Sequence, residues 1–202
     1  MPAVSEHYRT ARRREITEAA RRCFARKGFA GTSMSDVFAE SGLSAGAVYG
    51  YFTSKDQLIS AIIDEVLAEV GRSLAPARED GNLEPLPQVL GRFLHALRSS
   101  LADDVPGLAV QVWAEAQRDH TLRGRLADDH RRVREHFARL LELHVERGTV
   151  PDGAPVAEMA EILAALGPAF LVQDALLGDL DPDRLTTGFA GLLAVNPGIA
   201  TG

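Results

Sequence analysis

The chain has 202 residues, of which 46% are hydrophobic and 25% are charged, the composition of a folded globular protein rather than a disordered or fibrous one. Cys23 is the only cysteine, which excludes an intrachain disulfide and a zinc site built from several cysteines. No apolar run approaches the ~20 residues that cross a bilayer, and the N-terminus is polar and basic, so we expect a cytoplasmic protein with no membrane partner.

The net charge of −6 is distributed unevenly along the chain. Residues 1–55 carry nine Lys/Arg and five Asp/Glu, a net charge of +4, whereas residues 56–202 carry thirteen and twenty-three, a net charge of −10. A basic segment joined to an acidic body is the asymmetry expected of a nucleic-acid-binding module attached to a domain with another task.

The apolar spacing predicts a first helix over about residues 7–27, which Gly28 can end in the left-handed conformation. Its first turns are crowded with arginine, namely Arg9, Arg12, Arg13 and Arg14. Positive charge at a helix N-terminus is unfavourable for the helix dipole, but it suits a neighbouring polyanion. A solvated basic face explains the same residues equally well.

Residues 32–55 have the pattern of two short helices joined by a tight turn. Ser33 can cap the first helix, Asp36 can complete a capping box, and Gly42 can end the helix with a positive φ. Ser44 can cap the second helix. This is the helix-turn-helix unit that places its second helix in the major groove of DNA.

The second helix, expected over residues 45–51, is unusual in composition. Gly46 and Gly50 each cost about 1 kcal/mol relative to alanine in a helix interior, which suggests that the backbone must approach another large molecule closely. Groups that commonly donate hydrogen bonds to phosphate lie along it and just after it: Ser44, Tyr49, Tyr51 and Lys55. The alternative is a surface helical hairpin whose tyrosines only pack.

A specific set of residues runs through this unit: Gly28-Phe29, Gly31-Thr32-Ser33, Asp36, Ser41-Gly42-Leu43-Ser44, Gly46, Val48-Tyr49, Tyr51-Phe52, Ser54-Lys55 and Leu58. This set resembles the N-terminal domain of TetR-family (tetracycline-repressor-like) transcriptional regulators. The resemblance implies a dimer that binds a palindromic operator, usually represses, and is released by a small ligand held in a helical C-terminal domain.

The resemblance also implies roles for individual residues. Contacts to the DNA backbone would come from Thr32, Ser33, Tyr49, Tyr51 and Lys55, and the groove-facing positions would be Ser44, Ala45, Gly46 and Gly50. The family more often has a larger side chain in place of Gly50 and a polar one in place of Ala45. Both departures remove hydrogen bonds to base edges, so the operator sequence cannot be inferred.

A third helix can begin at Ser54, with Gln57 placed for a capping box, and its apolar spacing continues to about Leu74. One uninterrupted helix would then join the DNA-reading unit to the rest of the protein. We therefore expect a helix-turn-helix DNA-binding domain, residues 1–54, and a helical effector-binding and dimerisation domain, residues 55–202.

The rest of the chain also indicates helices, separated by loops rich in proline and glycine. Loops are expected at residues 75–87 and 148–154, and helices over about residues 86–101, 105–118, 120–147, 155–178 and 182–195. No alternating strand pattern and no Asn-Gly hairpin turn is present in the sequence. We predict an all-α fold.

The last two predicted helices are unusually apolar: apolar residues cover most of the first and form a stripe along the second. A helix that is apolar nearly all round must be covered on several sides. We expect a second copy of the chain to cover them in a symmetric four-helix interface, as the resemblance also implies. The expected interface residues are Ile162, Leu166, Phe170, Leu185, Phe189 and Leu192. A monomer with a thick core is the alternative.

A small-molecule cavity is expected among the C-terminal helices, with apolar walls and a few polar groups. The candidate walls are Phe93, Trp113, Met159 and Phe170, and the candidate polar groups are Gln111, Gln117, His120 and Gln173. For each residue, an ordinary core position is the alternative. Gly167-Pro168 lies within a predicted helix, where a proline kink can serve either the cavity or the subunit interface; we favour the cavity.

No catalytic or metal-binding pattern accompanies these features. The sequence contains no HExxH motif, no glycine-rich phosphate loop and no GxSxG elbow. We therefore expect neither an enzyme nor a metal or other cofactor. The expected function is that of a homodimeric, ligand-responsive regulator, most often a repressor, in which the helix from Ser54 transmits the ligand signal. A regulator without a small-molecule effector and a helical enzyme remain as alternatives.

Overall fold

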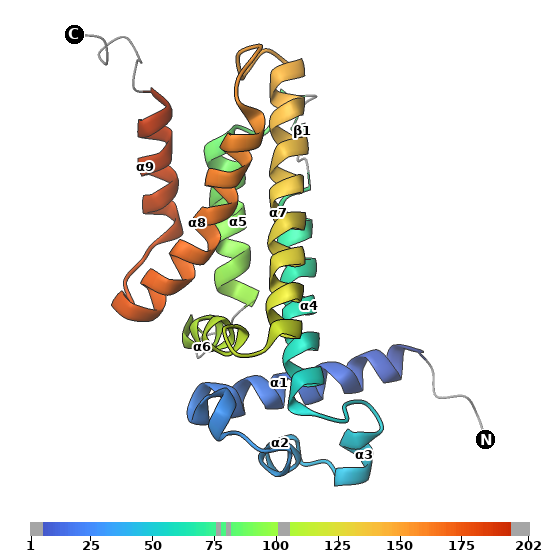
Figure 1. Cartoon of the computed structure of the whole chain (residues 1–202). Helices are drawn as coiled ribbons and strands as arrows, with labels where there is room; N and C mark the ends of the chain where they lie inside the picture. The colour runs from blue at the N-terminus through green and yellow to red at the C-terminus, as the bar shows by residue number, and fades with distance from the viewer. Residues whose placement is uncertain (1–5, 76–77, 80–81, 101–105, 195–202) are drawn as a thin grey trace.

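The computed structural model describes residues 6–75, 78–79, 82–100 and 106–194. Over these ranges the chain forms nine α-helices (Figure 1): α1 Glu6–Gly31, α2 Met34–Ser41, α3 Ala45–Tyr49, α4 Lys55–Ser73, α5 Leu86–Ser100, α6 Pro106–Ala116, α7 His120–Glu146, α8 Val156–Leu177 and α9 Pro182–Ala194. The all-α prediction is confirmed.

Helices α1, α2 and α3, which we call the head, lie together at one end of the molecule (Figure 1). Helix α4 starts beside them and continues into a bundle with α5, α7 and α8, while α9 packs on α5. The head meets the bundle through α4 and α6, both of which contact α1. As predicted, α4 is one uninterrupted helix of 19 residues.

Each helix of the head turns one face toward an apolar core that continues through α4 into the bundle. The buried residues are Ile16, Ala20, Cys23, Phe24, Val37, Val48, Phe52 and Leu58. Helix α3 is so short that Val48 alone anchors it in this core. The remaining residues of α3 are therefore left on the surface.

The helix ends follow the local signals in the sequence, with one difference. The Ser33 hydroxyl accepts a hydrogen bond from the Asp36 backbone N–H at 3.2 Å, and the Asp36 carboxylate accepts one from the Ser33 N–H at 2.8 Å, so the predicted capping box is confirmed. At α4, Ser54 caps the helix, but the Gln57 side chain accepts from the N–H of Thr53 at 2.9 Å. The predicted second capping box is thus displaced by one residue.

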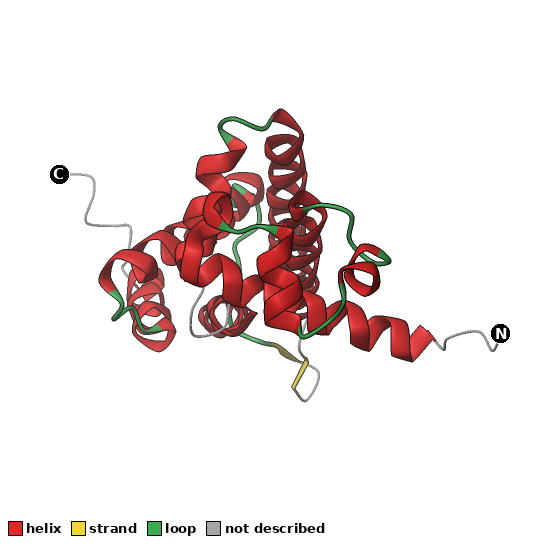
Figure 2. Cartoon of the chain, turned by 90° about the horizontal axis from the view of Figure 1, so that it is seen from below, coloured by secondary structure: helices red, strands yellow, loops and turns green. Residues whose placement is uncertain are grey.

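Helix α3 is shorter than predicted. The N–H groups of Tyr51 and Phe52 both donate to the carbonyl of Val48, each at 2.9 Å, so the chain tightens into a turn after Tyr49 instead of continuing as a helix. The predicted loop before α5 contains a small antiparallel ladder of β1 (Arg78–Glu79) and β2 (Asn82–Leu83), which lies at the edge of the molecule (Figure 2). Leu101, expected on the fifth helix, lies outside the described residues.

Helix α8 corrects one expectation from the sequence. It has 22 residues and, by length and composition, is apolar enough to cross a membrane. The expectation that the chain contains no apolar segment of this length is therefore wrong. A core helix of a soluble protein passes the same test, and α8 packs against α5, α6 and α7. Helix α8 continues through Pro168. The preceding residue, Gly167, allows α5 to pack closely, because a Cβ at this position would lie 2.7 Å from the Cζ atom of Phe93.

Candidate nucleic-acid interface and internal cavity

The surface of the head at α3 consists of small and hydroxyl-bearing residues. Those exposed are Ser44, Ala45, Gly46, Ala47, Tyr49 and Gly50, whereas Val48 is buried. Tyr49 is 47% exposed and its ring packs edge-on against Phe38 with the centroids 5.2 Å apart. The residues expected to face the groove therefore share one solvent-facing surface, and Tyr51 lies half-buried at its end.

The two glycines of this surface are not required by the fold. A Cβ built on Gly46 meets no atom within 4 Å, and one built on Gly50 makes only ordinary contacts with backbone oxygens at 3.4 and 3.5 Å. Gly50 has φ −66° and ψ −16°, which any residue adopts. Neither packing nor backbone strain within the described structure explains why these positions lack side chains.

Two other expected contact residues hold the end of α1. Thr32 is 2% exposed and its hydroxyl lies 2.8 Å from the carbonyl oxygen of Gly28, to which it donates. The Lys55 ammonium donates to the carbonyl of Phe29 at 2.8 Å and lies 4.7 Å from the centroid of the Phe29 ring. Thr32 therefore faces the protein interior, and Lys55 fixes the turn after Gly28, whose φ is 73°.

Ion pairs fix α2 against α1. Glu40 pairs with Arg22 at 2.6 Å and also with Arg26, while Lys27 pairs with Asp36 at 2.5 Å. The Lys27 ammonium, followed by the hydrogen bonds from Ser33, holds the pKa of Asp36 well below its usual value. Hydrogen bonds from Arg22 and Arg26 lower the pKa of Glu40 in the same way. The position of α2, and hence of α3, is set by these contacts together with the apolar core.

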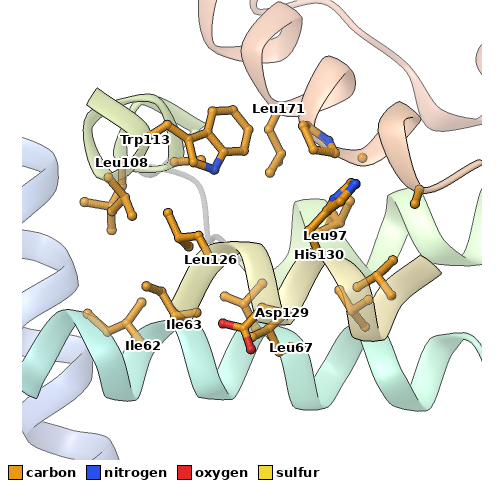
Figure 3. Close-up of a pocket in the computed structure, with 18 of the residues that line it drawn as sticks. Ile62, Ile63, Leu67, Leu97, Leu108, Trp113, Leu126, Asp129, His130 and Leu171 are labelled. Atoms are coloured by element: carbon orange, nitrogen blue, oxygen red, sulfur yellow. The ribbon is translucent and has the colours of Figure 1, made fainter. Parts of the chain in front are cut away.

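A cavity of about 160 Å³ lies in the bundle, between α4, α5, α6, α7 and α8 (Figure 3). Its walls are almost entirely apolar: they include Ile62, Ile63, Leu97, Trp113, Leu126 and Leu171. Phe93, Gly167 and Pro168 also line it. The lining groups with charged or titratable side chains are Asp129 and His130, neighbours on α7.

The two polar groups differ in their surroundings. His130 is exposed, whereas Asp129 is 5% exposed. One carboxylate oxygen of Asp129 lies 3.5 Å from Nη1 of Arg132, and the other, Oδ2, has no hydrogen-bond partner within the described structure. Burial raises the pKa of Asp129, while the charges of Arg125 and Arg132 act in the opposite direction.

The ligand residues expected from the sequence fall in different places. Phe93 and Trp113 line this cavity, whereas Phe170 and Gln173 line a separate groove between α5, α8 and α9. Gln111 faces the head, where its side-chain oxygen accepts a hydrogen bond from the N–H of Phe29. The remaining three residues do not line the cavity. Met159 packs on the core, and Gln117 and His120 are exposed.

Asp129 and His130 were not among the predicted ligand residues, although the sequence carries a signal for Asp129. Leu126, Asp129 and Val133 are spaced three and four apart, so Asp129 occupies a position on the apolar stripe of α7. A carboxylate on such a stripe is the unusual feature. Among the described residues, no cluster of three His, Cys, Asp or Glu side chains is placed to hold a metal ion.

The sequence of the chain is similar to those of known transcriptional regulators. Residues 16–62 match the sequence profile described as bacterial regulatory proteins of the tetR family. The HTH-type transcriptional regulator YfiR of Bacillus subtilis is 31% identical over 179 residues, which are 88% of this chain and 86% of that protein. The chain belongs to the TetR family. It is a DNA-binding transcriptional regulator.

Further relatives of this TetR-family regulator agree with that assignment. The HTH-type transcriptional repressor AcnR of Corynebacterium diphtheriae is 27% identical over 90% of both chains. The structure of Salmonella enterica GusR superposes with a TM-score of 0.74, covers 95% of this chain and 99% of its own, and is 24% identical, so it supports the fold.

The outer surface of α8 and α9 in this TetR-family chain is unusually apolar. The exposed large residues are Ile162, Leu176, Leu177, Leu185, Leu192 and Leu193, of which Ile162 is 63% and Leu192 73% exposed. Of the other expected interface residues, Leu166 and Phe189 are half-buried, and Phe170 is already buried within the chain at 2% exposure. Phe170 therefore belongs to the core of the single chain, and its side chain leaves little surface for a partner.

Proposed function

We propose that this TetR-family regulator binds a palindromic operator as a homodimer, represses transcription, and is released when a small, largely apolar molecule occupies the cavity between α4 and α8. The observation that carries the proposal is that two helices lining the cavity, α4 and α6, are also the helices through which the bundle contacts α1 of the head. A ligand that moves either helix moves the DNA-reading surface.

The proposed DNA contacts come from the exposed end of the head. Tyr49 and Tyr51 supply hydroxyl groups for phosphate, and Ser44, Ala45, Gly46 and Gly50 form the surface that enters the groove. The Ser33 hydroxyl donates to the Asp36 carboxylate at 2.7 Å, so it can donate to phosphate only by giving up that bond. We propose indirect roles for Thr32, whose hydroxyl is occupied inside the head, and for Lys55, which fixes the turn that carries Ser33. The fold would tolerate a side chain at Gly46 and at Gly50, so their lack of one supports a close approach of the backbone to the bases.

The apolar outer surface of α8 and α9 supports the homodimer. Six large apolar residues are exposed on α8 and α9, and exposed apolar patches commonly mark protein–protein contacts. A two-fold interface formed by these helices buries the same surface on both chains. The dimer must present its two α3 helices about one DNA turn apart, roughly 34–36 Å, to engage both half-sites.

The proposed release works through the packing of the cavity. Ile59, Ile62 and Ile63 of α4 and Val112 and Trp113 of α6 line the cavity, so a bound ligand contacts both helices at once. If the ligand fits better when the heads are splayed, it shifts the population away from the DNA-bound form. A coupling of ~1–3 kcal/mol weakens operator binding about 5- to 150-fold.

Repression is the favoured direction because relatives such as AcnR are named repressors. The second candidate is a regulator that has no small-molecule effector. In that case the cavity would be a void left by imperfect packing and would bind no ligand. An enzymatic function has no support, since the relatives are regulators. The bacterial cytoplasm, where the chromosome lies, is the proposed location.

The first test is protection of DNA from the region upstream of the protein's own gene, with unlabelled random DNA as competitor. Protection of a short two-fold-symmetric site supports the dimeric reader, and that fragment then serves to screen for molecules that abolish protection. A folded dimer that protects no such site at low salt contradicts the DNA-binding part of the proposal. Protection that no cavity ligand changes contradicts the ligand response.

A further inference from the structure

Asp129 is the feature of the cavity that the apolar packing does not explain. It lies beside Leu67 where α7 faces α4 (Figure 3), on a stripe whose other members are apolar. Its side chain is buried, and Oδ2 has no hydrogen-bond partner within the described structure. A buried carboxylate is strongly unfavourable unless it is paired, so a fold that needed only stability would place leucine or valine here.

The neighbouring cations do not satisfy this oxygen. Arg125 is directed to α4, where it pairs with Asp64 and donates to the carbonyl of Ser60 at 3.2 Å. Arg132 reaches only Oδ1, at 3.5 Å, and most of its side chain is in solvent. Asp64 and Asp128 add negative charge nearby. Among the described residues, none donates to Oδ2, and Asp129 lies between the apolar cavity and a polar surface groove that Asp64, Arg125 and Arg132 also line.

We infer that the cavity binds an apolar molecule that carries one protonated nitrogen, and that this nitrogen donates a hydrogen bond to Oδ2 of Asp129. The inference rests on the proposed ligand response and specifies the chemical class of the ligand. The apolar body of the ligand packs against Trp113, Phe93 and Leu171, which offer no charge. A protonated amine both supplies the missing donor and neutralises the buried charge, whereas a neutral hydroxyl supplies the donor alone.

The chain contains its own reporter for this test. Trp113 is the only tryptophan and it lines the cavity, so its fluorescence emission reports what binds there. Three probes of nearly equal size separate the alternatives at pH 7: cyclohexylmethylamine, which is protonated, its neutral isostere ethylcyclohexane, and cyclohexylmethanol, a neutral donor. We expect cyclohexylmethylamine to bind at least tenfold more tightly than either of the neutral probes.

Two variants test the role of the carboxylate. Asp129→Asn removes the charge and should abolish the preference for the amine. Asp128→Asn is the matched control: Asp128 is adjacent, exposed and paired with Arg131 at the surface, so the preference should remain. Asp129→Leu should raise the melting temperature of the unliganded protein and reverse the preference in favour of ethylcyclohexane. This melting temperature does not depend on any ligand.

The outcomes separate this inference from the proposed function. Equal binding of amine and ethylcyclohexane, equal binding of amine and cyclohexylmethanol, or an amine preference that persists in Asp129→Asn each overturns the inference and leaves the ligand cavity in place. An amine preference that has no effect on DNA protection supports the inference and contradicts the ligand response as proposed. If none of the probes changes Trp113 emission, the inference is overturned.

Discussion

The backbone N–H of Phe29 donates a hydrogen bond to Oε1 of Gln111 at 2.8 Å, across 82 residues of sequence. Phe29 lies in the turn that ends α1, and Gln111 lies on α6 between residues that line the cavity. Gly28 makes room for this contact, since a Cβ there would lie 3.2 Å from the same oxygen. The bond joins the end of the α1 helix, next to the helix-turn-helix, directly to a helix that lines the cavity.

Gln111→Leu should weaken this connection. The Phe29 N–H is part-buried and would lose its acceptor, so we expect the free energy of unfolding to fall by about 1–3 kcal/mol. The change in operator affinity caused by a ligand should also decrease. Gln111→Glu keeps an acceptor of the same shape and is the control. Urea unfolding and operator titration with and without ligand measure both effects, and wild-type behaviour of Gln111→Leu would show that the bond carries no coupling.

Gly46→Leu should separate stability from DNA binding. Leucine is the better helix former by about 0.5–1 kcal/mol, and no atom within 4 Å opposes its Cβ, so the head should become no less stable. Operator affinity should nevertheless fall at least tenfold, because the side chain holds α3 away from the DNA. Gly124→Leu, at an equally open site on α7, is the control that should bind normally. Fluorescence anisotropy with a labelled operator makes the comparison.

Leu192→Arg should disrupt the proposed dimer. The residue is largely exposed in the single chain, so the substitution should leave the fold intact while it places a charge within the apolar surface of α8 and α9. Sedimentation equilibrium should show a monomer, and operator affinity should fall together with dimer formation. Val110→Arg, also at an exposed apolar residue but on α6, should remain dimeric. A dimeric Leu192→Arg protein would place the interface elsewhere.

His144 should make stability depend on pH. It is buried, and its Nδ1 atom lies 2.7 Å from the Thr149 hydroxyl. Burial lowers the pKa of His144, against a smaller opposite effect of the Glu84 backbone, so the folded state takes up a proton at lower pH than the unfolded chain does. Stability from the neutral ring is therefore complete above about pH 6.5 and is lost as the pH falls below it.

The loss should reach at most about 1.4 kcal/mol per pH unit for this one group. Urea unfolding between pH 7.5 and 5 measures the slope, and His144→Gln should reduce it. The exposed His120 provides the control, since His120→Gln should leave the slope unchanged. Burial also lowers the pKa of His136, so part of the slope should persist in His144→Gln. An unchanged slope in that variant would contradict the assignment.

Helix ends were predictable because their determinants are local. Ser33 and Asp36 form the expected capping box, and Gly28 and Gly42 adopt the expected positive φ values of 73° and 67°. Contacts between helices were harder to predict. Residues two apart on a helix point to different faces, so Gln111 and Trp113 could not both face the cavity. Which of the two faces it could not be predicted from the sequence.

The partition of the apolar residues could not be predicted either. The sequence of α8 alone predicts Phe170 as an interface or ligand residue, because that helix is apolar on nearly all sides. Its burial depends on how α5 and α9 pack, which no single helix encodes. Asp129 is the opposite case, since its position on the apolar stripe of α7 was visible in the sequence.

Six of the eight cations of the head are paired with carboxylates within the protein, although residues 1–55 keep a net charge of +4. The cations paired with carboxylates are Arg12, Arg14, Arg21, Arg22, Arg26 and Lys27. Binding to DNA should therefore displace fewer counterions than the number of basic residues suggests. Since log K changes by about 0.9 per neutralised phosphate for each decade of salt, the slope of a salt titration counts the phosphates that are neutralised. If that count is small, operator occupancy would change little when osmotic stress raises the ionic strength inside the cell, and the occupant of the cavity would be the main signal.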